Sequence, residues 1–263
     1  MRLICAGITD VGVARDHNED DFYLSQGGEP LCVVADGMGG HRSGEVASAL
    51  AVETIVQYYR DTVLDPEDEA AAVRSRFWPW RKRKPDNSEE RRLVQAILCA
   101  NKAIYDASEK NEGSKGMGTT VVAAYFVESG LYIAHIGDSR TYRLRHGKLE
   151  LLTEDHSLAN EYVRMGILSP ADLEHFPYKN VVTRACGLAE EVEVESNFEA
   201  SEDGDIYLLC SDGLTDCVPD VDIHRILMEH DDLDDASAVL VDAANRNGGT
   251  DNITVILAQT LLA

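Results

Sequence analysis

Four apolar segments of this chain are each joined to an aspartate, and this feature constrains its fold most. Asp36 follows LCVVA, Asp138 follows LYIAHIG, Asp212 follows IYLLCS, and Asp251 directly precedes NITVI. A carboxylate beside a buried segment is costly unless it is paired or bound to a cation. If the four segments are strands that reach one rim of the fold, their carboxylates meet there and require a divalent cation.

Short runs rich in β-branched and aromatic residues predict strands. They lie at 31–35, 119–127, 131–136, 141–145, 192–198, 206–210 and 253–258. Apolar residues at helical spacing predict helices at 45–59, 91–109 and 236–245. The consecutive strands within 119–145 favour antiparallel pairing with helices laid outside the sheets. The sequence therefore predicts a layered α+β fold, and its 263 residues suit one catalytic domain spanning 1–263.

Two segments depart from this pattern. Residues 61–92 hold both tryptophans beside a basic run at 81–84, and they read as an insertion that either docks an acidic partner or a membrane surface or is a solvated loop. Residues 157–183 combine the amphipathic pattern SLANEYVRMGIL with SPADLEHFPYKN and connect two strand regions. We interpret this second segment as a lid-like flap.

The composition narrows the functional classes. A formal net charge of −23, from 47 acidic and 24 basic residues, argues against nucleic-acid binding because phosphate backbones would be repelled. The six cysteines are scattered without a CxxC pair and are typical of buried reduced thiols. The N-terminus lacks the apolar region of a signal peptide, and no run approaches the ~20 apolar residues of a membrane span. We therefore expect a cytoplasmic protein without a transmembrane segment.

The candidate ligands of the cation are almost all oxygen atoms. Glu19 and Asp20 in RDHNEDD join the four aspartates, whereas clustered cysteines and an HExxH pair are missing from the sequence. Oxygen ligands favour Mg²⁺ or Mn²⁺ over zinc. Two such ions about 3.5 to 4 Å apart can share a water and stabilise in-line displacement at phosphorus. Hydrolysis of a phosphate ester is the matching chemistry.

Glycines and an arginine surround these carboxylates. Gly37 after Asp36 and Gly213 after Asp212 permit tight turns and close approach of the backbone to a ligand, so a main-chain carbonyl can join the ligands. Each Asp-Gly pair is also an ordinary turn former. Arg15 offers a planar fork for two phosphate oxygens, although an arginine near acids is also a common salt-bridge partner.

The ordered motifs of the chain resemble the PPM family of metal-dependent protein phosphatases, also called type-2C serine/threonine phosphatases, in their bacterial form. The motifs are RDHNED at 15–20, DGMGGHRSGE at 36–45, GMGTT at 116–120, IGDSR at 136–140, TEDHSL at 153–158, NVVTRACG at 180–187, CSDGLTD at 210–216 and GGTDNITV at 248–255. The resemblance covers nearly the whole chain apart from 61–92. It implies a four-layer αββα sandwich of two antiparallel sheets, with the metal centre at one end.

The resemblance also implies positions for the site. Asp36 would bridge two Mn²⁺ or Mg²⁺ ions, with the carbonyl of Gly37 on one of them and Asp212 and Asp251 on the other side. Glu19 and Asp20 would hold ligands or waters. A third, weaker site corresponds to Asp138 with Asp212, and Arg15 corresponds to the arginine that binds the substrate phosphate. Asp36, Asp212 and Arg15 are thus the expected catalytic residues.

One position departs from part of the family. Animal members carry a histidine just after the Asp-Gly pair, which is thought to protonate the leaving group, and Met38 occupies that position here. Methionine cannot donate a proton, so a water on the metal ions is the expected acid. His41 and His156 are alternatives, although for each of them a hydrogen-bonded loop histidine is the favoured interpretation.

Two rival functions lead to different expectations. An inactive, phosphoprotein-binding member should have lost a bridging carboxylate, but Asp36, Asp212 and Asp251 are all present. A metal-dependent nuclease should carry a basic groove, which the net charge opposes. We expect a monomeric phosphatase that acts on phosphorylated proteins. Small bacterial phosphatases of this kind commonly reverse Hanks-type kinase signalling, and some serve secretion systems, so a Ser/Thr kinase and its targets are the expected partners.

Overall fold

The computed structural model describes residues 1–25, 30–39, 42–62, 88–110, 112–169, 172, 176–178 and 180–261. Most of the predicted insertion at 61–92 lies outside the described residues, and so does His41.

The strands form two antiparallel sheets. The first contains, in spatial order, β1 (Arg2–Asp10), β11 (Ile253–Leu261), β10 (Ile206–Cys210), β7 (Arg140–Arg145) and β8 (Lys148–Leu151). The second contains β2 (Asp20–Tyr23), β3 (Leu31–Met38), β5 (Val121–Val127), β6 (Gly130–Ile136) and β9 (Glu195–Ala200), and the short β4 (Gly118–Thr119) pairs with β3. Because β1 pairs with β11 from Arg2 opposite Leu261 to Asp10 opposite Ile253, the first and last strands lie side by side.

The alternation of side chains along the strands explains the layers. On β3, Leu31, Val33 and Ala35 pack against the helices α1 (Ser43–Asp61) and α2 (Ser88–Lys110), whereas Cys32 and Val34 face the other sheet. Successive residues of a strand point to opposite faces, so one strand serves two layers of core.

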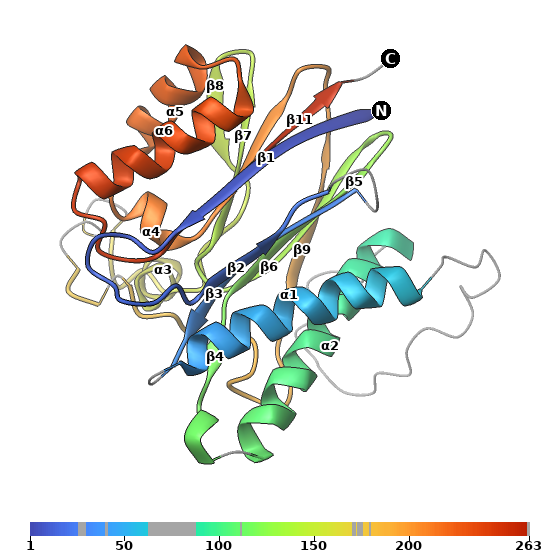
Figure 1. Cartoon of the computed structure of the whole chain (residues 1–263), viewed down its shortest axis with the longest axis vertical. Coiled ribbons are helices and arrows are strands. Elements are labelled where there is room, and N and C mark those ends of the chain that lie inside the picture. The colour runs from blue at the N-terminus through green and yellow to red at the C-terminus, as the bar shows by residue number, and fades with distance from the viewer. Residues whose placement is uncertain are drawn as a thin grey trace.

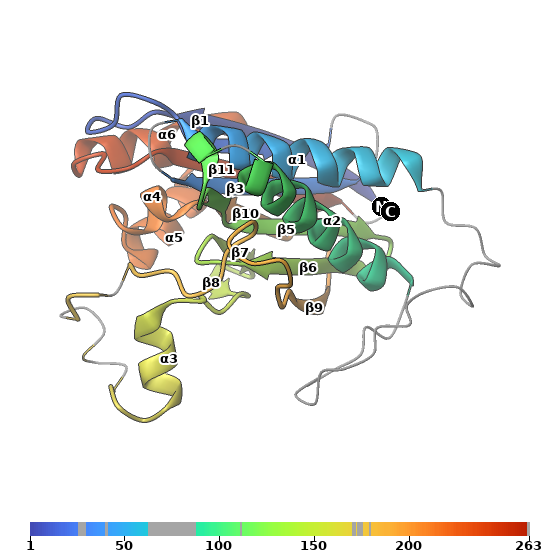
Figure 2. The ribbon, with the colours of Figure 1, turned by 90° about the horizontal axis from the view of Figure 1, so that it is seen from below.

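The first sheet is covered on its outer face in the same way. The helices α5 (Asp220–Glu229) and α6 (Leu233–Arg246) bury Ile223, Leu227 and Leu240 against β7, β10 and β11. Figures 1 and 2 show one helix pair on each side of the two sheets. The predicted α+β class and its four-layer αββα arrangement are confirmed.

Three short helices lie outside the layers. They are the 3₁₀-helix η2 (Glu112–Ser114), α3 (Leu158–Arg164) and α4 (Asp212–Thr215). The α3 helix falls in the segment predicted as a flap and projects from the sandwich in Figure 2. It begins at an N-cap, Ser157, whose side chain accepts a hydrogen bond from the amide of Asn160.

The boundaries of several elements differ from the sequence prediction. The strand expected at 119–127 is interrupted at Thr120, whose backbone amide donates to the carbonyl of Asp36 at 2.8 Å instead of extending the ladder with β6. Residues 192–194 precede β9, and Val192 and Val194 pack against the second sheet's helix-side core. The strands β1, β2 and β8 and the helix α5 were not predicted. The β8 segment KLEL is largely exposed, which weakens the apolar signal of a strand.

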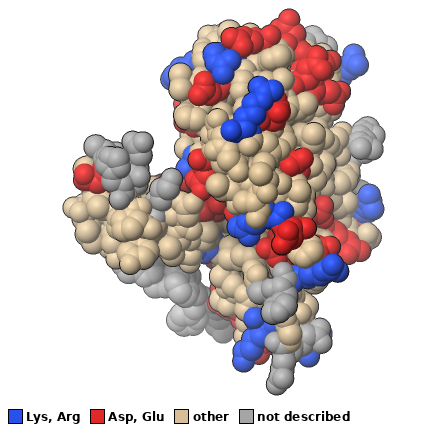
Figure 3. All heavy atoms as spheres, turned by 60° about the vertical axis from the view of Figure 1, so that its left-hand side comes forward, with Lys and Arg blue, Asp and Glu red and all other residues tan. Residues whose placement is uncertain are grey.

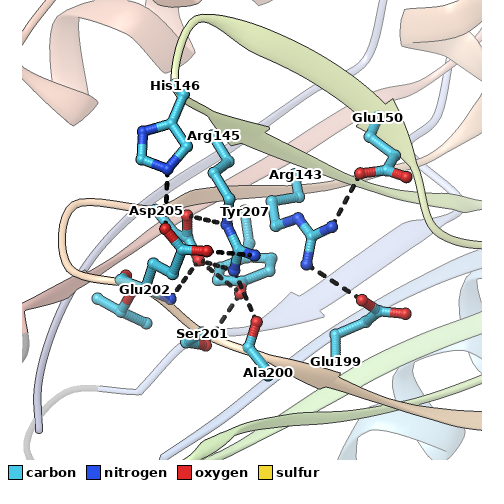
Figure 4. A network of polar contacts seen from close by, with 11 residues as sticks. Arg143, Arg145, His146, Glu150, Glu199, Ala200, Ser201, Glu202, Asp205 and Tyr207 are labelled. Carbon is cyan, nitrogen blue, oxygen red and sulfur yellow. Dashed lines mark hydrogen bonds and ion pairs between the residues drawn. The ribbon is translucent and has the colours of Figure 1, made fainter.

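Ion pairs connect the two sheets on the side formed by β7, β8 and β9. Arg143 of β7 bonds Glu150 of β8 at 2.8 Å and Glu199 of the opposite sheet at 3.1 Å (Figure 4). Arg145 holds the buried Asp205 through two hydrogen bonds, Nε to Oδ1 at 2.8 Å and Nη2 to Oδ2 at 2.5 Å. Although burial opposes it, these contacts lower the pKa of Asp205.

Candidate active site

Carboxylates from distant parts of the chain lie together at one rim of the sandwich. Asp20 on β2 is directly opposite Asp36 on β3. Asp212 begins α4 just after β10, and Asp251 stands just before β11, the neighbour of β10. Burial, followed by the charges of Asp20, Asp212, Asp138 and Asp251, raises the pKa of Asp36 well above its usual range. The structure therefore brings the predicted aspartates together around Asp36.

Buried oxygen atoms of this cluster are left without hydrogen bonds. Asp20 Oδ2 accepts from Ser211 Oγ at 2.8 Å and from Thr254 Oγ1 at 2.7 Å, but Asp20 Oδ1 has no partner among the described residues. Glu19 Oε1 and Asp212 Oδ1 are likewise buried and unpartnered there. An unsatisfied buried acceptor is costly, and a divalent cation would satisfy all three. The residues present thus fit an oxygen-liganded metal centre.

Two glycines allow the backbone to approach this centre. A Cβ on Gly37 would lie 2.5 Å from the carbonyl oxygen of Glu19, which itself accepts the Gly37 amide at 3.0 Å. A Cβ on Gly44, at the start of α1, would lie 2.6 Å from Glu19 Oε1. Only glycine fits where the end of β3, the start of α1 and Glu19 meet. Gly37 and Gly44 are therefore required by the packing around Glu19.

Asp138 lies in the turn between β6 and β7, and two contacts fix this turn. The Gly137 amide donates to His156 Nδ1 at 3.1 Å, and the His156 amide donates to the Gly137 carbonyl at 2.9 Å. Burial first, and then the charge of Asp155, raises the pKa of Asp138 to about 6. Asp138 is thus held at the rim in a strongly acidic setting.

The ring of His156 is buried and fully engaged. It stacks on His135 with 4.8 Å between centroids, and its Nε2 lies 3.4 Å from Glu195 Oε1. Of the two readings of His156, the hydrogen-bonded loop histidine matches these contacts. His135, His156 and Glu195 do lie close together, but the two rings are nearly parallel, at 14°, so their nitrogen lone pairs do not converge on one ion.

Arg15 reaches the centre from the N-terminal loop. Its Nη2 lies 2.6 Å from Asp251 Oδ2, and its Nε donates to the carbonyl of Thr250 at 3.4 Å. The side chain is 46% exposed, so the guanidinium is open to solvent while it contacts the carboxylate. The salt bridge considered as an alternative is present, and it places the guanidinium at the edge of the cluster.

The N-terminal loop is attached to the centre by Asn252. Its Nδ2 donates to the carbonyls of Val11 and His17 at 2.9 and 2.8 Å, and its Oδ1 accepts the amide of Glu19 at 2.7 Å. This one amide side chain orders the loop that carries Arg15 and Glu19.

A cavity of about 200 Å³ extends from Asp138 and Asp212 toward the flap. Its lining includes Asp155, Asn180 and Asp216, which sequence analysis did not select. Asn180 of the flap donates a hydrogen bond to Asp216 after α4. A signal was available: Asp216 follows Asp212 by four residues, one helical turn, and Asp155 lies within TEDHSL.

A sequence profile of protein phosphatase 2C matches residues 13–257. The chain belongs to this family. The serine/threonine phosphatase stp of Listeria monocytogenes is 39% identical over 253 residues, covering 95% of this chain and 93% of the relative. The Mycobacterium tuberculosis serine/threonine phosphatase PstP/Ppp has a similar structure, with a TM-score of 0.83, 33% identity and coverage of 98% and 99% of the two chains. A structure of the PstP catalytic domain in complex with two manganese ions matches with a TM-score of 0.79 and 33% identity over 98% of each chain.

The profile match confirms the resemblance to type-2C phosphatases that the sequence motifs indicated. The profile spans every motif from RDHNED to GGTDNITV, including the Gly-rich segment in which Met38 replaces the histidine of animal members. Met38 is the last residue of β3. None of the described helices is both long and apolar enough to cross a bilayer.

Proposed function

We propose that this 2C phosphatase hydrolyses phosphoserine and phosphothreonine in proteins, using Mn²⁺ or Mg²⁺ ions held at the carboxylate rim. The ligands would be Glu19, Asp20, Asp36, the carbonyl of Gly37, Asp138, Asp212 and Asp251. The observation that carries the proposal is a set of buried oxygens beside Asp36, one each on Glu19, Asp20 and Asp212, that have no hydrogen-bond partner in the part of the chain that the structure describes. The serine/threonine phosphatase relatives and the two manganese ions bound by PstP support it.

The carboxylates of this centre would hold the ions at different positions. Bound ions would supply Lewis-acid activation of water and neutralise the charge that develops on the phosphoryl oxygens. Asp36 lies among the other carboxylates and would be one of the residues that hold the ions. Asp138 and Asp212, which both line the flap-side cavity, would form the weaker third site.

Arg15 would bind the substrate phosphate. Its guanidinium lies at the exposed edge of the cluster, where Nη2 contacts Asp251 and Nε donates to the carbonyl of Thr250. Among the described residues Nη1 has no hydrogen bond, so the Nη1–Nη2 edge can face the phosphoryl oxygens. The charge-assisted pair would orient the phosphorus toward the carboxylate rim.

Protein substrates fit the surroundings of the site better than nucleic acid does. On the face drawn in Figure 3, Lys and Arg side chains are interspersed with Asp and Glu and do not form a continuous basic band. A polyanion would be repelled by the net charge of −23. Phosphorylated proteins, with a Ser/Thr kinase and its targets as partners, remain the proposed class. The proposal also includes a monomeric state. It places the enzyme in the cytoplasm, which the six free cysteines support because thiols stay reduced there.

The decisive experiment compares phosphate release from a phosphothreonine peptide by the wild type, Asp36→Asn and Asp212→Asn, with and without Mn²⁺. We expect metal-dependent turnover and losses of several orders of magnitude in both variants. Each variant removes one of several repelling charges, so the metal-free protein should keep or raise its Tm. Asp234→Asn, on the surface of α6, serves as the matched control. Unchanged rates in either variant, or full activity in excess chelator, would refute the mechanism.

A further inference from the structure

Two cysteines from opposite sheets contact each other in the core layer between the sheets. The Sγ atoms of Cys5 on β1 and Cys32 on β3 lie 4.0 Å apart, close to van der Waals contact. Both side chains belong to the core between the sheets, where they pack with Val34, Leu209 and Ile256. The contact joins residues that are 27 positions apart in the sequence and lie in different sheets.

The two thiols differ in access and acidity. Cys32 is fully buried, whereas Cys5 is half-buried on β1, an edge strand of the first sheet. The hydrogen bond with Cys32 lowers the pKa of the Cys5 thiol, while the same contact and burial raise the pKa of Cys32. Thiolate character and access decide which thiol reacts with an oxidant. Cys5 is therefore the thiol that a small oxidant would reach first.

The two sulfur atoms already lie close enough for rotation of the side chains to bring them together. A disulfide requires the sulfurs to close to about 2.05 Å. Rotation of the two side chains therefore has to shorten the distance between the Sγ atoms by only about 2 Å.

We propose that Cys5 and Cys32 form a reversible redox site, in which a hydroperoxide converts the two thiols into an inter-sheet disulfide. The Cys5 thiolate attacks the terminal oxygen of the hydroperoxide, the O–O bond breaks, and the alcohol or water leaves as Cys5 becomes a sulfenic acid. The Cys32 sulfur then attacks the Cys5 sulfur, and the S–O bond breaks to release water with the Cys32 proton. Two electrons pass from the thiols to the peroxide, and an external dithiol reverses the change.

The disulfide would stabilise the fold and leave the metal rim in place. It would close a loop between residues 27 positions apart, so Tm should rise by roughly 5 °C or more. Cys32 precedes Asp36 by four strand residues, about 13 Å along β3. Phosphatase activity should therefore stay within about twofold of the reduced protein.

The test treats the full, folded chain with hydrogen peroxide at low temperature, quenches with catalase, and maps disulfides under non-reducing conditions. We expect a mass loss equal to two hydrogens, a cross-linked peptide pair containing Cys5 and Cys32, the rise in Tm, and reversal by dithiothreitol. The matched variant Cys99→Ser, which removes another half-buried thiol, should still form the link. Cys32→Ser should leave Cys5 as a sulfenic acid that dimedone captures.

Three results would overturn the inference: a link between other cysteines, further oxidation of Cys5 without a link, or no change under conditions that oxidise an unfolded control. A link that lowers Tm would also overturn it. The wild-type peptide map decides the question even if Cys32→Ser does not fold. Because the readout is covalent, it is independent of whether the proposed phosphatase mechanism holds.

Discussion

Several carboxyl groups at the rim are buried in surroundings that disfavour their charged form. Burial raises the pKa of Asp20 to about 6, even though Ser211 and Thr254 donate to one of its oxygens. Burial and the neighbouring charge of Asp138 also raise the pKa of Asp212. Burial of these carboxylates costs the metal-free protein stability, as is expected of residues that bind a cation.

The first prediction at this scale concerns pH and stability without metal. Asp20 and Asp138 have a pKa of about 6 in the folded state, above the value of about 4 for an unfolded aspartate. Between these values the folded state binds more protons, so stability falls as pH rises from about 4 to about 6. We expect a loss of about 2 kcal/mol or more over this window, measured by urea unfolding in chelator.

The same reasoning gives its control. Asp20→Asn should flatten the pH dependence, and saturating Mn²⁺ should reverse its direction because the ion binds the deprotonated carboxylates. Stability of the metal-free wild type that rises through this window would contradict the burial of repelling carboxylates.

The aspartates at the rim could be predicted from the sequence because each is adjacent to an apolar run. Asp155 and Asn180 are marked in the sequence only by the motifs TEDHSL and NVVTRACG. Neither residue adjoins a strand, so their approach to the rim, which depends on how the flap returns to the sandwich, has no local signal. The hydrogen bond from the Gly137 amide to His156 could not be predicted from the sequence either, because it requires the segment before α3 to lie beside the β6–β7 turn.

Among the elements, the flap and α4 lie on either side of the cavity next to the carboxylate rim. The cavity between them is lined from both sides, and the hydrogen bond from Asn180 to Asp216 joins them. The α3 helix itself projects from the sandwich (Figure 2) and exposes Met165 and Ile167 nearby. Among the described residues of the flap, Asn180 makes the hydrogen bond that joins the flap to the residue after α4.

Removal of this contact gives a prediction for Asn180→Ala. We expect KM for a phosphopeptide to rise several-fold, because the flap is less well held, while kcat on the small substrate para-nitrophenyl phosphate changes less than twofold. Ser169→Ala removes a hydrogen bond to Asp172 within the flap and is the matched control. Equal losses on both substrates would show that Asn180 supports the metal rim and not the flap.

The prediction of elements succeeded where strands are buried on both faces. LCVVA and TTVVAAYFV carry continuous apolar runs because helices cover one side and the other sheet covers the other side. The β1 segment RLICAGITD was missed because Gly7 interrupts it and most of its residues are only half-buried. The facing of β1 and β3, which brings Cys5 to Cys32, depends on the docking of two sheets and leaves no local signal.

At the scale of the whole molecule, the two sheets are joined by polar contacts at the side remote from β1 and β2. Arg143 links β7 to β9, and Arg145 holds Asp205 before β10 (Figure 4). Asp205 also accepts from the amide of Glu202 at 2.7 Å and from the hydroxyl of Tyr207 at 3.1 Å. Asp205 thus orients Arg145, and Arg145 reaches the second sheet by donating to the carbonyl of Ala200 on β9 at 2.6 Å.

Asp205→Asn should therefore destabilise the protein and leave catalysis intact. Loss of the charge leaves Arg145 without its main partner, and we expect about 1 to 3 kcal/mol of destabilisation by urea unfolding. Asp205 lies at the opposite end of β10 from Asp212, roughly 20 Å away along the strand, so kcat/KM should be unchanged below the unfolding transition. Glu150→Gln, at a partly exposed partner of Arg143, should cost less than 1 kcal/mol. A larger effect of Glu150→Gln than of Asp205→Asn would contradict this ranking.

The pairing of the first and last strands has a practical consequence. Arg2 lies beside Leu261, and β1 then runs about 27 Å before it reaches Asp10, near the loop that carries Arg15. A fluorophore, affinity tag or solid support attached next to Arg2 or Leu261 would therefore lie at the end of the sandwich opposite the carboxylate rim. Immobilised protein should then still bind large phosphoproteins at that rim.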